Sequence, residues 1–469
     1  MKSNEIPIEV RYQILRDEHA ILVAECSRKD RIIEEQEARI GDLEKRLAKY
    51  ERPVMNSGNS SVPPTQEPIR EKVIRHTTSS RETSGRKPGG QVGHKGSTQS
   101  TSMEPTEVVE YKPHVCERCG ASLEGADFEK VSSHRVLDFI VIPVCCEHAA
   151  YRCKCTCGHV NRAYLPKGKA HRSCFGPNTR ALVPFLSVAQ GIPFKRLCQI
   201  MEEVFHLKMS EGTVNNIIKE AGALAKYPYE VIRRLVEESN VVGADETGLY
   251  VNGKLHWAWT FQNDWLTYIF QNKSRGMKAV NEHFPDHFPN ATVVSDRHST
   301  YLNLVTACKQ VCLAHILRNL EYANELAPYQ DWSPKFQALL REAMGVWEAN
   351  GRKPADPHVM EHLRRRLDEL LEEDFSQCEH GKELETLRKG LAKWKDHFFT
   401  FLIREGVPPD NNGSERAVRN IKVKQKVSGC FRTEDGADNY VVLRSIIDTA
   451  HKNGQPLLNV LLELFNLRY

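Results

Sequence analysis

Apolar residues between positions 12 and 50 recur at alternating steps of three and four, or at multiples of seven. This spacing predicts one long helix whose apolar stripe pairs with a second helix as a coiled coil. A helix packed against its own domain is the alternative interpretation. We therefore expect residues 1–51 to drive self-association, as a homodimer or a higher homo-oligomer. The stripe consists of Tyr12, Leu15, Leu22, Cys26, Ile33, Ile40, Leu43, Leu47 and Tyr50, interrupted by Lys29 and Gln36.

The next stretch, residues 52–111, is polar and rich in Gly, Pro and Ser. Such a composition cannot bury enough apolar surface to fold alone. Within it, the segment GRKPGGQVGHKG sets Arg86, Lys87 and Lys95 among glycines, so that the chain could follow a DNA phosphate backbone closely. A plain flexible linker is the alternative.

Seven of the 14 cysteines lie between positions 116 and 157. In a chain without secretory signals, metal binding explains such a cluster better than disulfides do. Cys116 and Cys119 form a CxxCG zinc knuckle. The second group is irregularly spaced, and we expect its zinc ligands to be Cys157 and either Cys153 or Cys155. With the β-prone residues 136–144 between the two groups, we expect a Zn²⁺-binding ribbon over residues 112–165.

Residues 166–235 have a helical pattern. A helix at 194–205 is followed by a short turn and by a second helix that begins after Ser210, a good N-cap. This arrangement predicts a helix-turn-helix whose second helix reads DNA, although two packed helices without a DNA role would look the same. The exposed polar residues of the second helix would be Thr213, Asn215, Asn216 and Lys219.

From position 240 the pattern changes to strands. Alternating and β-branched runs predict an antiparallel meander of three strands, followed by alternating helices and strands. This order gives a mixed α/β sheet domain over residues 236–320. The expected strands are 241–245, 254–261, 265–271, 291–296 and 310–313, and the expected helices are 276–284 and 314–326.

Two of these strands end in an aspartate, Asp245 and Asp296. A carboxylate at the end of a buried strand is costly unless it pairs or binds a metal. Two of them in one sheet predict a shared site for Mg²⁺ or Mn²⁺, as phosphoryl transfer requires, although each alone could be a turn residue. Strand alternation points the neighbouring Glu246 to the other face of the sheet.

The rest of the chain is helical. Residues 321–405 are heavily charged and predict a helical insertion, and residues 437–469 predict a helical tail. Between them, the 406–436 segment carries Glu415, which either completes the metal site or closes a capping box with Asn412. The basic residues that follow would grip DNA phosphates. They are Arg416, Arg419, Lys422, Lys424 and Lys426.

The overall charge of +4 is weak evidence, but its distribution is informative. Between positions 416 and 432 there are six basic residues and no acidic ones, a local excess that suits a phosphate backbone or, equally, a solvated face. The longest apolar tracts, 139–146 and 181–194, are too short to cross a bilayer. We expect a cytoplasmic protein without a membrane segment.

The motifs together resemble the insertion sequence 66 family of DDE transposases. The resemblance is carried by GRKPGGQVGHKG, the CxxCG knuckle, FGPNTRALV, SEGTV, ADETGLYV, VVSDRHSTY, CLAH, NNGSERAVRNIKVKQKVSGCFRTEDGA and LRSIIDTAHKNGQPLLNVL, and it covers nearly the whole chain. It implies an RNase H-like catalytic domain with Asp245, Asp296 and Glu415 as an acidic triad. Cys312 and His315 fall on a C-x-x-H element of the family, with a metal-binding or a structural role.

We therefore expect a multidomain α+β protein that combines a coiled coil, a zinc ribbon, a helix-turn-helix and an RNase H-like domain. The expected activity is cleavage and joining of double-stranded DNA at the ends of an insertion sequence, with the help of Mg²⁺ and of accessory proteins of the same element where these are needed. The alternatives are a non-catalytic DNA-binding regulator, a purely hydrolytic nuclease of the same fold and, from another class, a coiled-coil scaffold.

Overall fold

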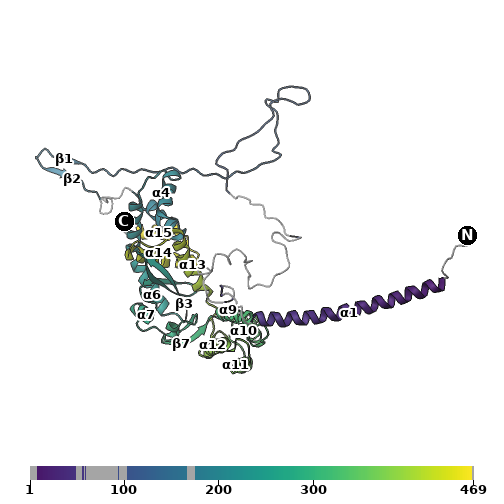
Figure 1. Cartoon of the computed structure of the whole chain (residues 1–469). Helices are drawn as coiled ribbons and strands as arrows, with labels where there is room; N and C mark the ends of the chain where they lie inside the picture. The colour runs from purple at the N-terminus through teal and green to yellow at the C-terminus, as the bar shows by residue number, and fades with distance from the viewer. Residues whose placement is uncertain are drawn as a thin grey trace. The chain divides into compact units, whose positions relative to one another are not determined.

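The computed structural model describes residues 8–48, 55–56, 59, 93, 103–165 and 175–466 (Figure 1). The chain divides into two units. The first comprises Met1–Ile74, Pro166–Leu197 and Glu211–Tyr469, and the second comprises Arg75–Leu165 and Cys198–Ser210. The basic residues of the glycine-rich segment, Arg86, Lys87 and Lys95, lie outside the described residues.

The N-terminal pattern forms the long helix that it predicts, α1 (Ile8–Ala48). Stripe residues whose side chains are described are exposed: Leu22, Ile33, Ile40 and Leu43 each expose half of their surface or more. An apolar stripe left in solvent on a long helix is typical of a coiled-coil strand seen alone. Pairing itself stays a prediction, and Tyr50 lies outside the described residues.

The cysteine-rich unit contains one hairpin, β1 (Arg152–Lys154) and β2 (Val160–Arg162), which pair antiparallel. The strands expected at 136–144 are not formed, and apolar side chains there, such as Ile140 at 87% exposure, lie in solvent. The sequence pattern was misleading here because β-branched residues form a strand only where a partner strand or an apolar layer lies against them.

A five-stranded sheet forms the centre of the first unit, in the order β5-β4-β3-β6-β7. The meander β3–β4–β5 is antiparallel, whereas β6 and β7 join parallel to β3, so the expected mixed sheet is confirmed. The last strand begins four residues earlier than the sequence indicated. The strands are β3 (Val241–Val251), β4 (Lys254–Gln262), β5 (Thr267–Asn272), β6 (Phe288–Ser295) and β7 (Thr306–Val311).

Helices cover both faces of this sheet (Figure 1). On one face α13 lies along β3 and β4, and α14 lies along β5. On the other face aromatic rings form the core, with Phe261 of β4 packed between Phe284 and Phe288 at centroid distances of 4.9 and 5.2 Å. The helices of the first unit outside the insertion are α3 (Pro177–Pro184), α5 (Glu211–Leu224), α6 (Lys226–Glu237), α7 (Met277–His283), α8 (Ser299–Leu302), α13 (Asn412–Ser428), α14 (Glu434–Lys452) and α15 (Leu457–Asn466). Helix α4 (Phe194–Glu203) begins in this unit, and its residues from Cys198 on belong to the second unit.

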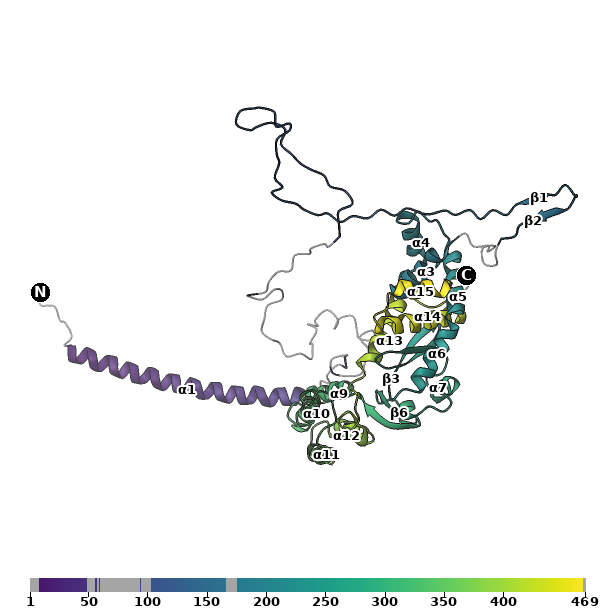
Figure 2. The same ribbon diagram turned by 180° about the vertical axis from the view of Figure 1, so that it is seen from behind.

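The segment expected to be a helical insertion is helical and packs beside β7 (Figure 1), and Figure 2 shows its helices α10, α11 and α12 grouped together. Its core is continuous with the sheet, because Val294 and Val311 belong to the same buried cluster as Trp332, Phe336 and Phe398. The indole of Trp332 donates to the carbonyl of Leu370 at 2.7 Å, which ties two of its helices together. These helices are α10 (Trp332–Ala349), α11 (Pro357–Leu371) and α12 (Gly381–Ala392), and α9 (Leu313–Leu326), expected at 314–326, leads from β7 into them.

Candidate active site

Asp245 and Asp296 lie on two neighbouring parallel strands, although the strand expected to end at Asp245 continues as β3 to Val251, and Asp296 directly follows the end of β6. The last paired residues of β3 and β6 are Gly243 and Val294, and each aspartate follows its paired residue by two positions. Alternate residues of a strand share a face, so this register puts Asp245 in line with Gly243 and Asp296 in line with Val294. Both pairs belong to the face of the sheet that α13 covers. The sequence prediction that these two carboxylates approach one another is supported by the register.

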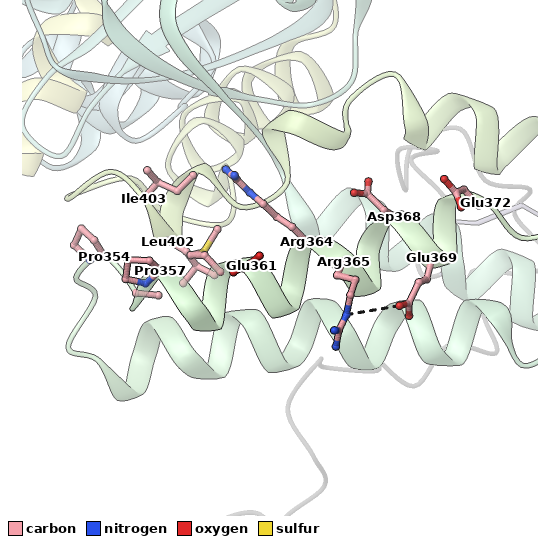
Figure 3. Close-up of a pocket in the computed structure, with 12 residues that line it drawn as sticks. Pro354, Pro357, Glu361, Arg364, Arg365, Asp368, Glu369, Glu372, Leu402 and Ile403 are labelled. Carbon is pink, nitrogen blue, oxygen red and sulfur yellow. Dashed lines mark ion pairs between the residues drawn. The ribbon is translucent and has the colours of Figure 1, made fainter.

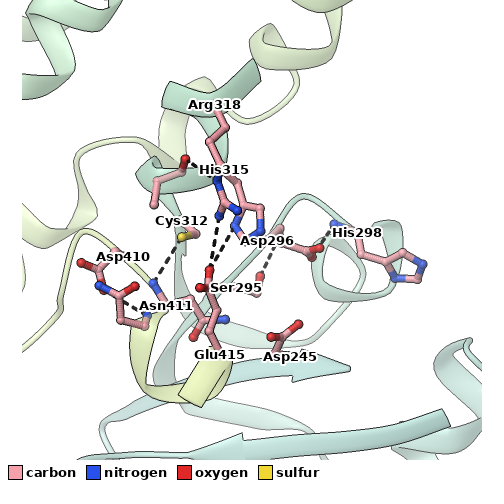
Figure 4. A network of polar contacts seen from close by, with 12 residues as sticks. Asp245, Ser295, Asp296, His298, Cys312, His315, Arg318, Asp410, Asn411 and Glu415 are labelled. Atoms are coloured by element: carbon pink, nitrogen blue, oxygen red, sulfur yellow. Dashed lines mark hydrogen bonds and ion pairs between the residues drawn. The ribbon is translucent and has the colours of Figure 1, made fainter. Parts of the chain in front are cut away.

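The start of α13 docks against β3 because the residues there are small. A Cβ on Gly243 would lie 2.7 Å from the hydroxyl of Ser414, and Ser414 is fully buried. Asn411, immediately before the helix, donates its side-chain amide to the carbonyl of Ala244 at 2.7 Å. These contacts bring Glu415, the residue after Ser414, to the edge where the aspartates lie (Figure 4).

Glu415 does not act as a helix cap. The N-cap position of α13 is Asn411, whose side chain makes no capping hydrogen bond, and Asn412 is already helical. The carboxylate instead faces helix α9, where Arg318 Nη2 lies 3.5 Å and His315 Nδ1 lies 3.8 Å from Glu415 Oε1. The capping-box alternative is therefore wrong for this helix.

Cys312 and His315 lie beside Glu415, and one ligand atom of each of the three residues falls within 4.8 Å of the others. Cys312 is fully buried and its sulfur accepts the backbone N–H of Asn411 at 3.3 Å. Burial raises the pKa of the Cys312 thiol to about 12, and burial lowers the pKa of His315 to about 4. The C-x-x-H element thus joins the start of α9 to the start of α13.

The two aspartates share uncompensated negative charge. Burial, followed by the charges of Glu246 and Asp296, raises the pKa of Asp245 well above its usual range. Burial and Glu246 likewise raise the pKa of Asp296. Within the described ranges, the ion pairs around the site involve Glu415 or Glu246 and neither aspartate. Hard oxygen donors that lack a cation fit a divalent metal.

Glu246 points to the opposite face of β3, as alternation predicts. Its side chain is 1% exposed and accepts from Arg275 Nη2 at 2.8 Å and from the hydroxyl of Tyr301. The guanidinium of Arg275 also lies over the ring of Trp257, 4.4 Å from its centroid. Glu246 is thus satisfied by a structural network on the far face.

Sequence reasoning missed Arg275, Tyr301 and Arg318. The first two could not be found, because their contact with Glu246 joins parts of the sequence that come together only through the sheet. For Arg318 a signal was available. It follows His315 by three residues on one helix, a spacing that places both side chains on one face.

The five basic residues of α13 do not have equal surroundings. Lys422 donates to the carbonyl of Gly248 at 2.9 Å, and Lys424 lies 5.7 Å from the ring centroid of Phe194. Burial lowers the pKa of both amines. Arg416, Arg419 and Lys426 are exposed along the helix.

A cleft of about 880 Å³ opens at the start of α13. Its lining includes Arg416, Arg419 and Arg352, together with Asn411 and Gln262. A second hollow, of about 840 Å³, lies on the insertion along α11 and is lined by both acids and bases, such as Arg365 and Glu369, which pair at 3.8 Å (Figure 3). The second hollow contains none of the residues predicted for DNA or metal binding.

Helix α5, expected to read DNA, exposes Asn215, Asn216 and Lys219, while Thr213 is half-buried. Lys219 lies 3.8 Å from Asp435 at the start of α14. A Cβ on Gly222 would meet the side chain of Asn439 at 2.1 Å, so α5 packs directly on α14. Asn215, Asn216 and Lys219 therefore lie on a helix that is packed within the unit that contains the sheet.

The two cysteine groups form similar loops. In the first, Gly120 N–H donates to the carbonyl of Cys116, and backbone N–H groups of Cys119 and Arg118 lower the pKa of the Cys116 thiol. In the second, Gly158 N–H donates to the carbonyl of Cys155 and the N–H of Cys157 lowers the pKa of its thiol. Cys153 lies instead in β1, opposite Asn161. The described structure does not gather the two loops into one four-cysteine site.

Comparison with known proteins gives one family. Residues 172–439, more than half of the chain, match the family described as Transposase IS66 family. None of the curated proteins compared with the chain matches it. The matched region contains Asp245, Asp296, Cys312, His315 and Glu415. In the part of the chain that the structure describes, every helix is too short or too polar to cross a membrane.

Proposed function

We propose that this chain, which belongs to the IS66 family of transposases, cuts DNA at the ends of an insertion sequence and joins the freed ends to target DNA. The site for both steps would be formed by Asp245, Asp296 and Glu415 on an RNase H-like domain. The observation that carries the proposal is the register of β3 and β6, which aligns the aspartates, with the helix that carries Glu415 docked beside them.

The three carboxylates would hold divalent metal, Mg²⁺ or Mn²⁺. Such metal, when bound, neutralises charge on the phosphate and activates the attacking oxygen. Asp245 and Asp296 supply two fixed oxygen donors from one sheet edge, held by backbone N–H groups of Glu246 and His298 at 2.9 Å each. Burial of these donors excludes bulk water and strengthens their attraction for a cation.

Cys312 and His315 would serve this site by holding α9 against the start of α13. The fully buried thiol of Cys312 already accepts the N–H of Asn411, and the backbone N–H of Leu313 donates to the carbonyl of Pro409 at 2.9 Å. Both contacts join the strand that leads into α9 to the loop that leads into Glu415. A direct metal-binding role for Cys312 and His315 is the second possibility, since their ligand atoms lie near Glu415.

The DNA backbone would run along the exposed face of α13 and the cleft at its start. Arg416, Arg419 and Lys426 present cations there, and Arg352 adds one from the end of α10. Base reading would fall to α5 through Asn215, Asn216 and Lys219. The glycine-rich segment with Arg86, Lys87 and Lys95 would add further phosphate contacts.

Two further modules would assemble the active complex. The exposed stripe of α1 would pair two protomers, so that both ends of the element are held together. The cysteine loops would fold around one Zn²⁺ held by Cys116, Cys119, Cys155 and Cys157. Accessory proteins of the same element remain possible partners.

The test is a cleavage and strand-transfer assay with a duplex that carries the element end and with Mg²⁺. Wild-type protein should nick the end and join it to a target, and Glu415→Gln should bind the end but neither nick nor join it. Glu405→Gln, an exposed acid with the same change of charge, is the control. Binding without nicking by the wild type would indicate a DNA-binding regulator. Nicking without joining would indicate a hydrolytic nuclease.

A further inference from the structure

The third acid of the proposed triad already has a cation beside it. Arg318 and His315 both approach the same oxygen of Glu415, Oε1, at 3.5 and 3.8 Å. They lie one turn apart on α9, on the face turned to α13. The guanidinium is further oriented by Nε, which donates to the carbonyl of Ala314 at 3.2 Å. Figure 4 shows the Glu415 carboxylate directed toward these two side chains.

The distribution of charge over the three acids is therefore uneven. Glu415 lies against a guanidinium, whereas Asp245 and Asp296 form no ion pair in the described part of the chain, and burial and the charge of Glu246 raise the pKa of both. In that part, the group of potential ligand atoms within 4.8 Å includes Glu415 but neither aspartate. For Glu415 to share a metal with the aspartates, its carboxylate must turn away from Arg318.

We propose that Arg318 is a positioning residue that competes with the divalent metal for Glu415. Arg318 holds the carboxylate of Glu415 toward α9, and the carboxylate would have to leave this contact to join Asp245 and Asp296 in holding a divalent metal. The inference rests on the proposed function, because it takes Asp245, Asp296 and Glu415 as the metal site. It predicts that the site binds metal more weakly than its three carboxylates alone would.

The burial of the pair sets the size of the effect. Arg318 exposes 29% and Glu415 25% of their side chains, so solvent screens the pair in part and the contact is modest. Removing the competing cation should therefore tighten metal binding by roughly 2- to 5-fold. A role confined to stability would leave the metal affinity unchanged.

The experiment measures Mn²⁺ binding to the full-length, zinc-loaded protein without DNA, by electron paramagnetic resonance of the unbound ion. Arg318→Gln should bind Mn²⁺ roughly 2- to 5-fold more tightly than the wild type. Arg341→Gln, which removes an exposed arginine of α10, should not change the affinity. An unchanged or weaker affinity of a folded Arg318→Gln protein would overturn the proposal.

Two further variants separate this inference from the proposed function. Asp245→Asn should lose Mn²⁺ binding; if it binds normally, the metal is elsewhere and the proposed function fails. If Asp245→Asn loses binding but Arg318→Gln does not tighten it, only the competition is refuted.

In a Glu415→Gln background, Arg318→Gln should have no effect on Mn²⁺ affinity, because the contact for which the metal competes is already gone. Should Arg318→Gln not fold, Arg318→Met, which keeps the apolar stem, gives the same comparison.

Discussion

The side-chain amide of Asn411 donates to the carbonyl of Ala244, 2.7 Å away, and so joins the residue before α13 to the residue before Asp245. Both residues are buried. The contact spans 167 positions of sequence and fixes the start of the helix that carries Glu415 at the strand that carries Asp245.

This arrangement predicts how substitutions of the acids behave. Asp245→Asn, Asp296→Asn and Glu415→Gln should each abolish strand cleavage and leave binding of the element end near normal, because an amide keeps the shape but removes the charge that metal needs. Each single loss should be about as severe as the triple loss, since the carboxylates act together. A nicking assay and a parallel gel-shift assay measure the two effects.

Glu246→Gln should behave differently from the three acids. It should lower the free energy of unfolding by about 2 kcal/mol, because the neutral amide weakens the contacts with half-exposed Arg275 and with Tyr301, yet folded protein should still cleave. Loss of cleavage by well-folded Glu246→Gln would show that total negative charge matters and not the position of each acid.

The mixed sheet could be predicted from the sequence because its signals are local. Strand alternation predicted the meander, and an aspartate after each of two apolar runs singled out Asp245 and Asp296 as candidates, although β3 continues past Asp245. Glu415 was ambiguous, since the same spacing also describes a capping box, and only the contact of Asn411 with Ala244 decides against it.

Contacts between distant segments could not be predicted. The pairing of Arg318 with Glu415 spans 97 positions and depends on how α9 meets α13. The strands expected at 136–144 illustrate the opposite error, because strong local β propensity there meets no partner. The five basic residues of α13 were treated as equals, whereas the tertiary structure places Lys422 on a carbonyl and Lys424 over a ring.

The second cysteine loop gives a prediction about zinc. Cys155→Ser and Cys116→Ser should each remove the bound Zn²⁺, because each thiol leads a loop whose N–H groups favour the thiolate. Cys153→Ser, two residues away in β1, is the matched control and should retain one zinc per chain. Metal analysis of freshly purified protein makes the comparison. Loss of zinc from Cys153→Ser with retention in Cys155→Ser would assign the ligand the other way.

The exposed stripe of α1 gives a prediction about assembly. Replacing Ile33 and Ile40 with Asp should turn an oligomer into a monomer, because charges on a coiled-coil seam cannot be buried against a partner helix. Removal of residues 1–50 should have the same effect and leave the sheet domain folded. Light scattering gives the mass and circular dichroism the fold. Glu34→Gln and Glu37→Gln, off the stripe, serve as controls, and an unchanged mass after removal of the helix would exclude the coiled coil.

His283 gives a prediction about acid stability. Its Nδ1 lies 2.8 Å from the hydroxyl of Tyr268 and its ring stacks on Phe270 with 3.8 Å between centroids. Burial lowers its pKa from 6.5 to about 4. Below the unfolded pKa the unfolded chain binds a proton that the folded chain refuses, so stability falls as the pH drops through this range.

Urea unfolding at two pH values tests this effect. Between neutral pH and about pH 5, the wild type should lose about 1–2 kcal/mol more unfolding free energy than His283→Gln does. His358→Gln, an exposed histidine on α11, should lose as much as the wild type. The effects of acid on other groups cancel because they are the same in the wild type and the variants. If the wild type and His283→Gln lost equal amounts of unfolding free energy, protonation of His283 would not destabilise the fold.

The exposed face of α13 gives a prediction about DNA. Arg416→Ala with Arg419→Ala should weaken binding to any duplex and reduce the slope of log affinity against log salt by about 2, one phosphate contact for each arginine. Lys422→Ala and Lys424→Ala should weaken it less and cost mainly stability, because Lys422 donates to Gly248 and Lys424 covers Phe194. Fluorescence anisotropy at several salt concentrations, with an element end and an unrelated duplex, measures both slopes. If the arginine pair loses affinity only for the element end, α13 reads bases and the phosphate contacts must come from the cleft or the glycine-rich segment.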